Sequence, residues 1–407
     1  MPFMKVYKQF IITAFNRKLL FLDGDSCWSY EITPDLPLEK CRPRKYFDAD
    51  SDSDEEDDES KPKNNNSEIQ PERQQPQSNG SKADKVQIVA LEVHEAKSLL
   101  AVATSDKSLY LFEILDTDGE KLKFLSRRLV SRASSCMCFA ASGGFLIVCD
   151  KGGDCYRYDC DDCKKLGRWL LGHMSQVLDV IITDDEKLII TCDRDEKIRI
   201  TNHPDCHTIE TFCLGHGEFV SQLAFLRNGE KSHLLSLSGD KTLRFWDYTN
   251  GKEMAKTELD QPGNRIVMKS LKDGSVIAAI LCYEPTEMAI VRLDAESLKC
   301  DALQTLNLKQ DELFSSFALD EKLNLLALVV AKDNGKVSLR VYPFDEENCK
   351  FGEESSNAMI NAFASNTESD RLPYVDSVSF LFKKKFDNIK DYQERKRRRM
   401  EEGGKLK

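Results

Sequence analysis

Short apolar runs alternate with polar turn residues along most of this chain. Four runs of strand length, each bounded by turn residues, are Val177–Ile182, Leu188–Thr191, Val276–Leu281 and Leu323–Val330. Apolar runs of about four to eight residues between turn signals are typical of buried β-strands. None approaches the roughly 20 apolar residues that a membrane helix requires. The pattern therefore predicts an all-β protein without a membrane span.

A repeat of about 40–45 residues underlies these runs. Leu171-Gly172-His173 recurs 43 positions later as Leu214-Gly215-His216. Downstream, Asp195–Ile200 is matched at an offset of 45 by Asp240–Asp247, which ends in Trp-Asp. Gly-His at the start and Trp-Asp at the end of such a period are the signature of WD40 repeats. Each repeat is a blade that must stack on its neighbours to bury its faces, so we expect a seven-bladed β-propeller.

Weaker copies at Ser105–Leu111, Cys149–Tyr156 and Asp333–Leu339 extend the repeat in both directions. We expect six blades at residues 84–116, 117–160, 164–203, 204–250, 251–296 and 297–346. A seventh is expected to combine residues 350–383 with strands from residues 3–32, so that both termini close the ring and leave no open edge. The expected domain order is closing strands at 1–39, an insertion at 40–83, the propeller at 84–383 and a tail at 384–407.

The repeats also predict a hydrogen-bond network inside each blade, in which the His of Gly-His meets the Asp of the following turn. Its expected members in residues 204–250 are His216, Ser236 or Ser238, Asp240 and Trp246. In residues 164–203 the expected members are His173, Thr191 and Asp195, without a tryptophan. We interpret all of these side chains as structural.

The net charge of −11 is unevenly distributed. Residues 48–59 carry nine acidic and no basic residues, whereas residues 383–407 carry eleven basic and five acidic ones. Block charges of this kind are typical of disordered interaction segments. Residues 60–83 are rich in Asn, Gln, Ser and Pro, so we expect the whole insertion at 40–83 to be disordered. The acidic body excludes a uniformly basic nucleic-acid binder.

Sequence motifs of common catalytic sites are absent. The chain has no phosphate-binding glycine loop, no dinucleotide fingerprint, no zinc-protease motif and no nucleophile elbow. Cys155, Cys160 and Cys163 are the best metal candidates, but no fourth ligand follows at a matching distance. We therefore expect no catalytic residue, no metal and no cofactor, and we interpret the fourteen cysteines as reduced thiols.

Two charged segments are candidate functional surfaces. Residues 192–200 mix charges of both signs, which suits either a solvated turn or a docking site for another protein. The tail contains two basic clusters, formed by Lys383, Lys384, Lys385, Arg395, Lys396, Arg397, Arg398 and Arg399. Such clusters are typical of nuclear localisation signals, RNA-backbone contacts or solubilising tails.

The two strong repeats between residues 145 and 250, together with SGDKTLRFWDY and the FKKKFDNIKDY tail, closely resemble the Wuho family. Its members are the non-catalytic WD-repeat subunits of tRNA (guanine-N7)-methyltransferase. The long acidic insertion departs from shorter relatives.

This resemblance implies a heterodimer with a separate catalytic subunit, which would bind S-adenosylmethionine. The pair would form N7-methylguanosine at position 46 of tRNA variable loops. The expected location is the nucleus, with the cytoplasm as a second location. The family's docking motif maps onto Arg194, Asp195, Glu196, Lys197 and Arg199, and Lys151 on the neighbouring blade is a further candidate. Arg199 is the expected partner of an acidic residue on the methyltransferase. The basic tail would lie near the tRNA.

Two other functions remain open from the residues. One is a ubiquitin-ligase substrate receptor, although Trp246-Asp247-Tyr248 is followed by Thr249, where such receptors often carry arginine. The other is a nuclear scaffold for genome maintenance or germline regulation that uses the insertion and the tail.

Overall fold

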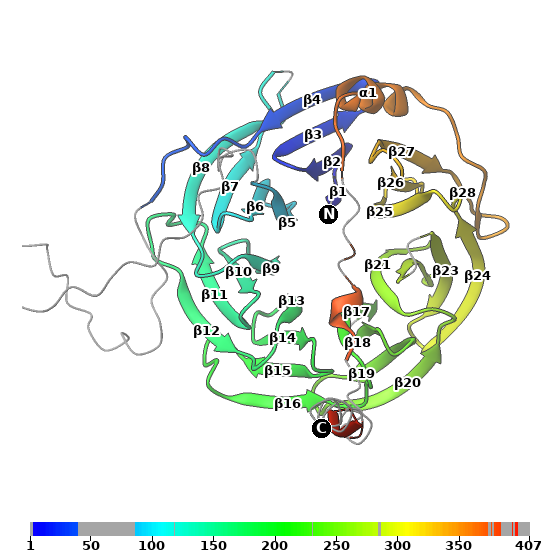
Figure 1. Ribbon diagram of the computed structural model, residues 1–407. Coiled ribbons are helices and arrows are strands. Elements are labelled where there is room, and N and C mark those ends of the chain that lie inside the picture. Colours follow the sequence, from blue (N-terminus) through cyan, green and yellow to red (C-terminus); the bar gives the residue numbers. More distant parts are fainter. Residues whose placement is uncertain are drawn as a thin grey trace, which may run out of the picture. The chain divides into compact units, whose positions relative to one another are not determined.

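The computed structural model describes residues 3–39, 86–117, 119–229, 231–283, 286–372, 376, 378–383, 393 and 395–397. The insertion predicted at 40–83 lies outside the described residues. The chain divides into two units, Met1–Val375 and Asp376–Lys407. The first unit is a ring of seven β-blades, which confirms the predicted propeller (Figure 1). Among the described residues no helix is long and apolar enough to cross a membrane.

The first three blades are four-stranded antiparallel sheets whose strands pair in chain order. Blade 1 consists of β1 (Phe3–Tyr7), β2 (Phe10–Phe15), β3 (Lys18–Asp23) and β4 (Ser26–Glu31). Blade 2 consists of β5 (Ile88–His94), β6 (Leu99–Thr104), β7 (Ser108–Ile114) and β8 (Leu122–Leu129). Blade 3 consists of β9 (Ser134–Phe139), β10 (Phe145–Asp150), β11 (Asp154–Asp159) and β12 (Arg168–Gly172).

The next three blades have the same order, and the last has only three strands. Blade 4 consists of β13 (Val177–Ile182), β14 (Leu188–Asp193), β15 (Ile198–Asn202) and β16 (Ile209–Cys213). Blade 5 consists of β17 (Val220–Asn228), β18 (Lys231–Ser238), β19 (Thr242–Asp247) and β20 (Lys252–Glu258). Blade 6 consists of β21 (Gly263–Ser270), β22 (Val276–Cys282), β23 (Glu287–Asp294) and β24 (Lys299–Asn307). Blade 7 consists of β25 (Glu312–Leu319), β26 (Leu325–Ala331) and β27 (Val337–Tyr342).

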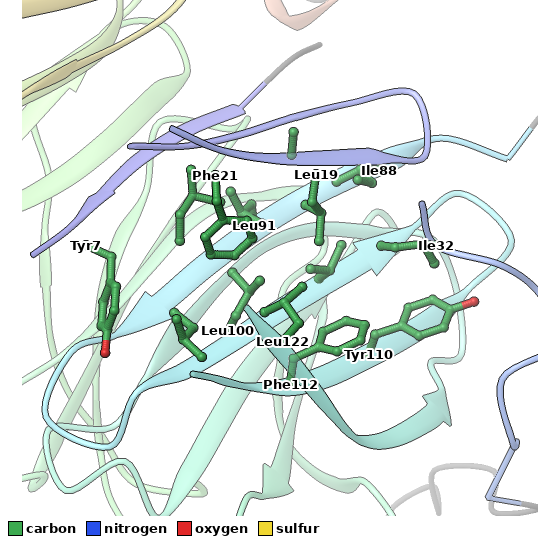
Figure 2. Packing of buried hydrophobic residues seen from close by; sticks show 14 of the residues in the cluster. Tyr7, Leu19, Phe21, Ile32, Ile88, Leu91, Leu100, Tyr110, Phe112 and Leu122 are labelled. Carbon is green, nitrogen blue, oxygen red and sulfur yellow. The ribbon is translucent and has the colours of Figure 1, made fainter. Parts of the chain in front are cut away.

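Apolar cores fill the seams between neighbouring blades. Figure 2 shows the seam of blades 1 and 2, where Phe21 and Tyr7 face Leu100 and Phe112. Strand β10 is buried along its whole length because a neighbouring blade covers each face of its sheet. This two-sided burial explains why the inner strands read as continuous apolar runs in the sequence. A further core joins blade 7 to blade 1 and closes the ring.

The predicted blade boundaries are wrong, because the expected units from 117–160 to 297–346 begin one strand too early. The expected unit at 164–203, for example, contains β12 of blade 3 and only β13–β15 of blade 4. Each sequence repeat thus supplies the outermost strand of one blade and the inner three of the next. Each sequence repeat therefore spans two neighbouring blades.

The composition predicted for the seventh blade is also wrong. Blade 1 is built from the N-terminal strands alone. Residues 344–372 add β28 (Phe344–Asp345), which pairs with β29 (Lys350–Phe351), helix α1 (Ala358–Thr367) and an isolated bridge from Arg371 to Lys336. The side chain of Asn357 caps α1 by accepting the N–H of Ile360 at 3.0 Å. The helix packs on β27, β3 and β4, so it covers the seam between the last blade and the first (Figure 1).

Candidate protein-docking site

The charged turn between β14 and β15 is shaped by Asp193, the last residue of β14. Its Oδ1 atom accepts hydrogen bonds from the backbone N–H groups of Asp195 (2.9 Å) and Lys197 (3.0 Å). Glu196 between them has a left-handed backbone with φ of 72°. A turn capped in this way by a side chain holds one backbone conformation. As a result, the side chains of Asp195 and Lys197 are presented to solvent on an ordered turn.

The expected partnership of His173 with Asp195 is wrong, because Asp193 takes that place. His173 Nδ1 lies 3.0 Å from Asp193 Oδ2, and its Nε2 lies 2.8 Å from Thr191 Oγ1. The turns of blades 4 and 5 have the same length, because Cys192 pairs with Ile198 and Leu237 pairs with Leu243. Blade 4 differs in carrying a carboxylate, Asp193, at the position where blade 5 has Ser238, and this carboxylate takes His173 and leaves Asp195 exposed for another role.

Arg199 is the second feature of this region, and it is a half-buried cation. Its Nε donates to Thr201 Oγ1 at 3.0 Å, and its Nη1 donates to the backbone oxygen of Gly172 at 3.1 Å. Burial lowers the pKa of its guanidinium, and no carboxylate among the described residues forms an ion pair with it. The equivalent Arg244 of blade 5 instead pairs with Glu253 at 2.6 Å. The guanidinium of Arg199 therefore keeps N–H groups that can bind an acidic partner outside this chain.

Lys151 lies on the turn between β10 and β11 of blade 3, and its side chain is exposed. In the same turn, the backbone oxygen of Gly153 accepts a hydrogen bond from the N–H of His173 at 2.9 Å. Gly153 has φ of 98°, and a Cβ there would lie 2.5 Å from the His173 oxygen, so only glycine fits. The N–H of Arg194 bonds the oxygen of Gln176 at 3.0 Å. The connection from β12 to β13 thus joins Lys151 and Arg194 into one surface.

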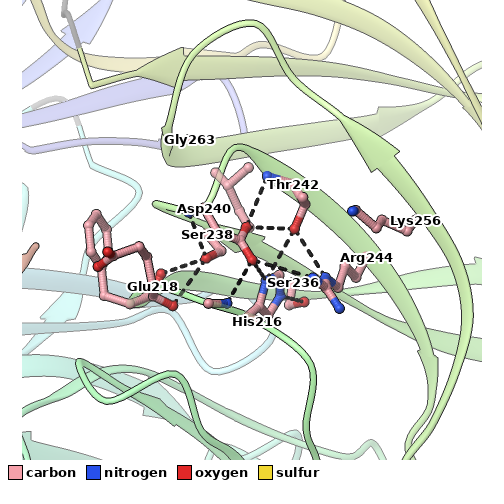
Figure 3. Close-up of polar contacts among 12 residues, drawn as sticks. His216, Glu218, Ser236, Ser238, Asp240, Thr242, Arg244, Lys256 and Gly263 are labelled. Carbon is pink, nitrogen blue, oxygen red and sulfur yellow. Dashed lines mark hydrogen bonds and ion pairs between the residues drawn. The ribbon is translucent and has the colours of Figure 1, made fainter. Parts of the chain in front are cut away.

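Blade 5 holds the full structural network (Figure 3). His216 Nδ1 lies 2.9 Å from Asp240 Oδ2, and its Nε2 lies 2.7 Å from Ser236 Oγ. Trp246 Nε1 donates to the same oxygen at 2.8 Å. Ser238 instead hydrogen-bonds the oxygen of Phe219 at 2.8 Å, so Ser236 is the serine of the network. These contacts join β18, β19 and the turn between them to the incoming connection, which is a structural task.

The network fixes the protonation of its members in a consistent way. Burial lowers the pKa of His216 and favours the neutral ring. Burial opposes the ionised form of Asp240, but hydrogen bonds from His216, from Thr242 and from the N–H of Gly217 outweigh this and hold the pKa of Asp240 well below its ordinary value. A neutral histidine donating to a carboxylate is a stable arrangement inside a blade.

Sequence reasoning missed two residues of the candidate surface. Arg132 is exposed on the connection before β9, and a Cβ on Gly152 would lie 2.6 Å from its Nη1, so it flanks the Lys151 turn. Met174 directly follows His173 and is 99% exposed. Arg132 carries no motif at all. Met174 falls within the Gly-His motif, but a methionine gives no sequence signal of exposure, because the residue is common in cores.

The three candidate metal-binding cysteines do not converge. Cys155 packs in the core between blades 3 and 4, whereas Cys160 and Cys163 pack in the core between blades 2 and 3. Burial raises the pKa of the Cys160 thiol to about 12, so it is held protonated. No group of three His, Cys, Asp or Glu side chains in the described part of the chain is arranged to hold a metal ion.

The tail belongs to the second unit and is described in part. Residues Ser379–Leu381 form a 3-10 turn, and Arg395, Lys396 and Arg397 are in helical conformation. Lys384, Lys385, Arg398 and Arg399 lie outside the described residues. The roles expected for Lys383 and for the other basic residues of the tail stay predictions.

Sequence comparison identifies relatives along the whole chain. The family described as "tRNA methyltransferase TRM82 WD40 domain" matches residues 26–165 and 161–361. A protein of Aedes aegypti named "tRNA (guanine-N(7)-)-methyltransferase non-catalytic subunit wuho" is 65% identical over 100% of this chain and 98% of its own length. Proteins of the same name from Culex quinquefasciatus and Drosophila melanogaster are 57% and 38% identical, over 99% and 75% of this chain and 98% and 72% of their own.

Structural comparison supports the fold alone. A chain from a crystal structure of the mitotic checkpoint complex superposes with a TM-score of 0.56 over 79% of this chain and 82% of its own length. The two sequences are 12% identical. At this level of identity the similarity extends to the fold and carries no functional information.

Proposed function

This chain belongs to the tRNA methyltransferase TRM82 WD40 family, and from that premise we propose that blades 3 and 4 bind the catalytic subunit of a tRNA (guanine-N7)-methyltransferase. The chain is a non-catalytic subunit of this enzyme, as are the relatives that match nearly its whole length. Its contribution to the reaction must therefore come from binding.

One observation carries the assignment of the docking site. Arg199 is half-buried without a carboxylate partner among the described residues, next to an ordered turn that exposes Asp195 and Lys197. A partly desolvated cation gains most from a carboxylate on a partner surface that excludes water from the ion pair. The exposed charges of both signs around it would fix the register of that partner. We assign Lys151, Arg194 and Glu196 to the same surface.

The proposed partner is a single catalytic subunit, which would bind S-adenosylmethionine and form a heterodimer with this chain. A subunit that binds only the active conformation of its partner raises activity by shifting the conformational equilibrium, without supplying a catalytic group. The product would be N7-methylguanosine at position 46 of tRNA. The basic tail, including Lys383 and Arg395–Arg397, would contact the tRNA backbone or direct the complex to the nucleus.

Co-purification of the two subunits tests the docking site. Arg199→Glu places a carboxylate where the partner is expected to present one, so the catalytic subunit should no longer co-purify with the chain. Lys241→Glu is the matched control, because Lys241 occupies the corresponding turn of blade 5 and its Nζ contacts the backbone oxygen of Asp260. Retention of the catalytic subunit by Arg199→Glu would show that the assigned surface is wrong.

A further inference from the structure

Three of the large apolar side chains that the structure leaves exposed lie on β16 or on the connections that follow β12 and β16. Met174 is 99% exposed, Leu214 is 65% exposed and Phe212 is 37% exposed. Phe212 is the residue directly opposite Arg199 across strands β15 and β16. Met174 lies two residues beyond Gly172, whose oxygen accepts the hydrogen bond from Arg199. Phe212 thus lies beside the half-buried cation, Leu214 lies two residues beyond Phe212, and Met174 belongs to the connection that Arg199 contacts.

The exposure of Leu214 is not inherent in its motif. Leu171 and Leu214 both precede Gly-His, yet Leu171 is completely buried between blades 3 and 4. Gly215, next to Leu214, is held closely, because a Cβ there would lie 2.5 Å from Arg244 Nη1 and 3.2 Å from Glu253 Oε2. The backbone that carries Leu214 is therefore fixed by its neighbours while the side chain faces solvent. A fixed, exposed leucine needs little ordering when a partner covers it.

We propose that Met174, Phe212 and Leu214 form the apolar part of the docking surface, and that the catalytic subunit covers them with an apolar depression beside the carboxylate that meets Arg199. This inference rests on the proposed function. Strong protein–protein contacts concentrate at a desolvated centre, where arginine and apolar side chains are surrounded by groups that exclude water. The apolar residues would provide this exclusion for the Arg199 ion pair.

The chemistry of the patch favours a protein over RNA. Aromatic stacking is the usual apolar contact with single strands, but Met174 and Leu214 offer no flat ring, and the ring of Phe212 is the least exposed of the three side chains. The neighbouring turn also sets the carboxylates of Asp195 and Glu196 among its cations, a mixture of charges that suits a protein better than a row of phosphate groups. A protein surface that carries both an acidic residue and an apolar depression satisfies all of these neighbours. The catalytic subunit is the occupant, because the patch is continuous with the docking surface assigned to it.

The test measures the affinity of the purified full-length chain for the purified catalytic subunit, with Met174→Ala and Leu214→Ala as variants. Each should weaken binding by about tenfold, as expected for an anchoring side chain. The loss should be the same at low and high salt, whereas the contribution of the surrounding charges should shrink as salt rises. Leu38→Ala is the matched control, since Leu38 is 39% exposed on the segment after blade 1, and it should bind as the wild type does.

The outcomes separate this inference from the proposed function. If Arg199→Glu abolishes binding but Met174→Ala and Leu214→Ala bind like the wild type, the apolar patch has no part in docking. If Arg199→Glu also binds normally, the docking site itself is wrong. Altered self-association of the variants in light scattering, with unchanged binding of the catalytic subunit, would identify a second copy of the chain as the occupant and overturn the inference. Because Met174 is 99% exposed, its variant decides the matter even if Leu214→Ala lowers the unfolding temperature.

Discussion

Arg199 donates a hydrogen bond from Nη1 to the backbone oxygen of Gly172, 3.1 Å away at the end of the neighbouring blade. This contact holds a cation of β15 against the connection that carries His173 and Met174. The side chain is therefore positioned before a partner arrives, so less conformational entropy is lost on binding. The docking surface is part of the seam between two blades, which makes it as rigid as the ring itself.

The different roles of Asp193, which is structural, and Asp195, which is exposed, can be tested by their effects on stability. Asp193→Ala removes the carboxylate that serves both His173 and the turn amides, and should lower the free energy of unfolding by about 2 kcal/mol, because buried polar groups lose their partner. Asp195→Ala, at an exposed position, should change it by no more than about 0.5 kcal/mol. Urea unfolding of both variants gives the comparison. Equal destabilisation would restore Asp195 to the structural network.

The seam between blades 7 and 1 should depend on helix α1. Phe363 is fully buried there, and its ring lies 6.3 Å from that of Phe15. Phe363→Ala should lower the free energy of unfolding by about 3 kcal/mol, because it opens a cavity in the closing core. Met359→Ala, at a partly buried position of the same helix, should cost less. Equal unfolding midpoints for Phe363→Ala and the wild type would show that the helix does not contribute to ring closure.

Asp179 should make stability depend on pH in an unusual direction. Its Oδ2 accepts the N–H of Leu223 in the next blade at 2.9 Å, and burial raises its pKa from 3.8 to about 6. Nearby Glu92 raises this pKa further, whereas Lys5 lowers it. The folded state therefore binds the proton more tightly than the unfolded state. The resulting stabilisation is fully present below pH 3.8 and is lost as the pH rises through about 6.

Asp179→Asn removes the ionisable carboxyl group but keeps an oxygen that can accept the N–H of Leu223. The wild type should therefore gain stability relative to this variant as the pH falls from about 7 to about 4. Urea unfolding of both proteins at several pH values measures this difference. A difference that stays constant over the range would show that Asp179 keeps its ordinary pKa.

The sequence was sufficient to predict the propeller but not the residues at which each blade begins and ends. Gly-His and Trp-Asp at a fixed period identify the repeat, but the blade boundaries depend on which strands pair. Blade 1 is completed by the N-terminal strands alone, so the last blade has three strands and a helix covers the seam. The spacing of Met359, Ile360 and Phe363 is helical, yet a short segment of this kind is hard to distinguish from a strand in a repeat of strands.

The candidate site shows a similar limit. Its charged residues stand out in the sequence, because they interrupt an apolar pattern in a turn. The exchange of Asp195 for Asp193 depends on which of two nearby carboxylates reaches His173, because blade 4 carries Asp193 where blade 5 has Ser238. Met174 and Leu214 look like core residues, and only the folded chain shows that nothing in its described part covers them.

The most direct test of the central claim measures methyl transfer to guanine N7 of tRNA by the purified catalytic subunit alone, with this chain, and with its Arg199→Glu variant. We predict that the wild-type chain raises the rate and that the Arg199→Glu chain leaves it at the level of the catalytic subunit alone. An equal rate with and without the chain, or equal activation by Arg199→Glu, would contradict the account.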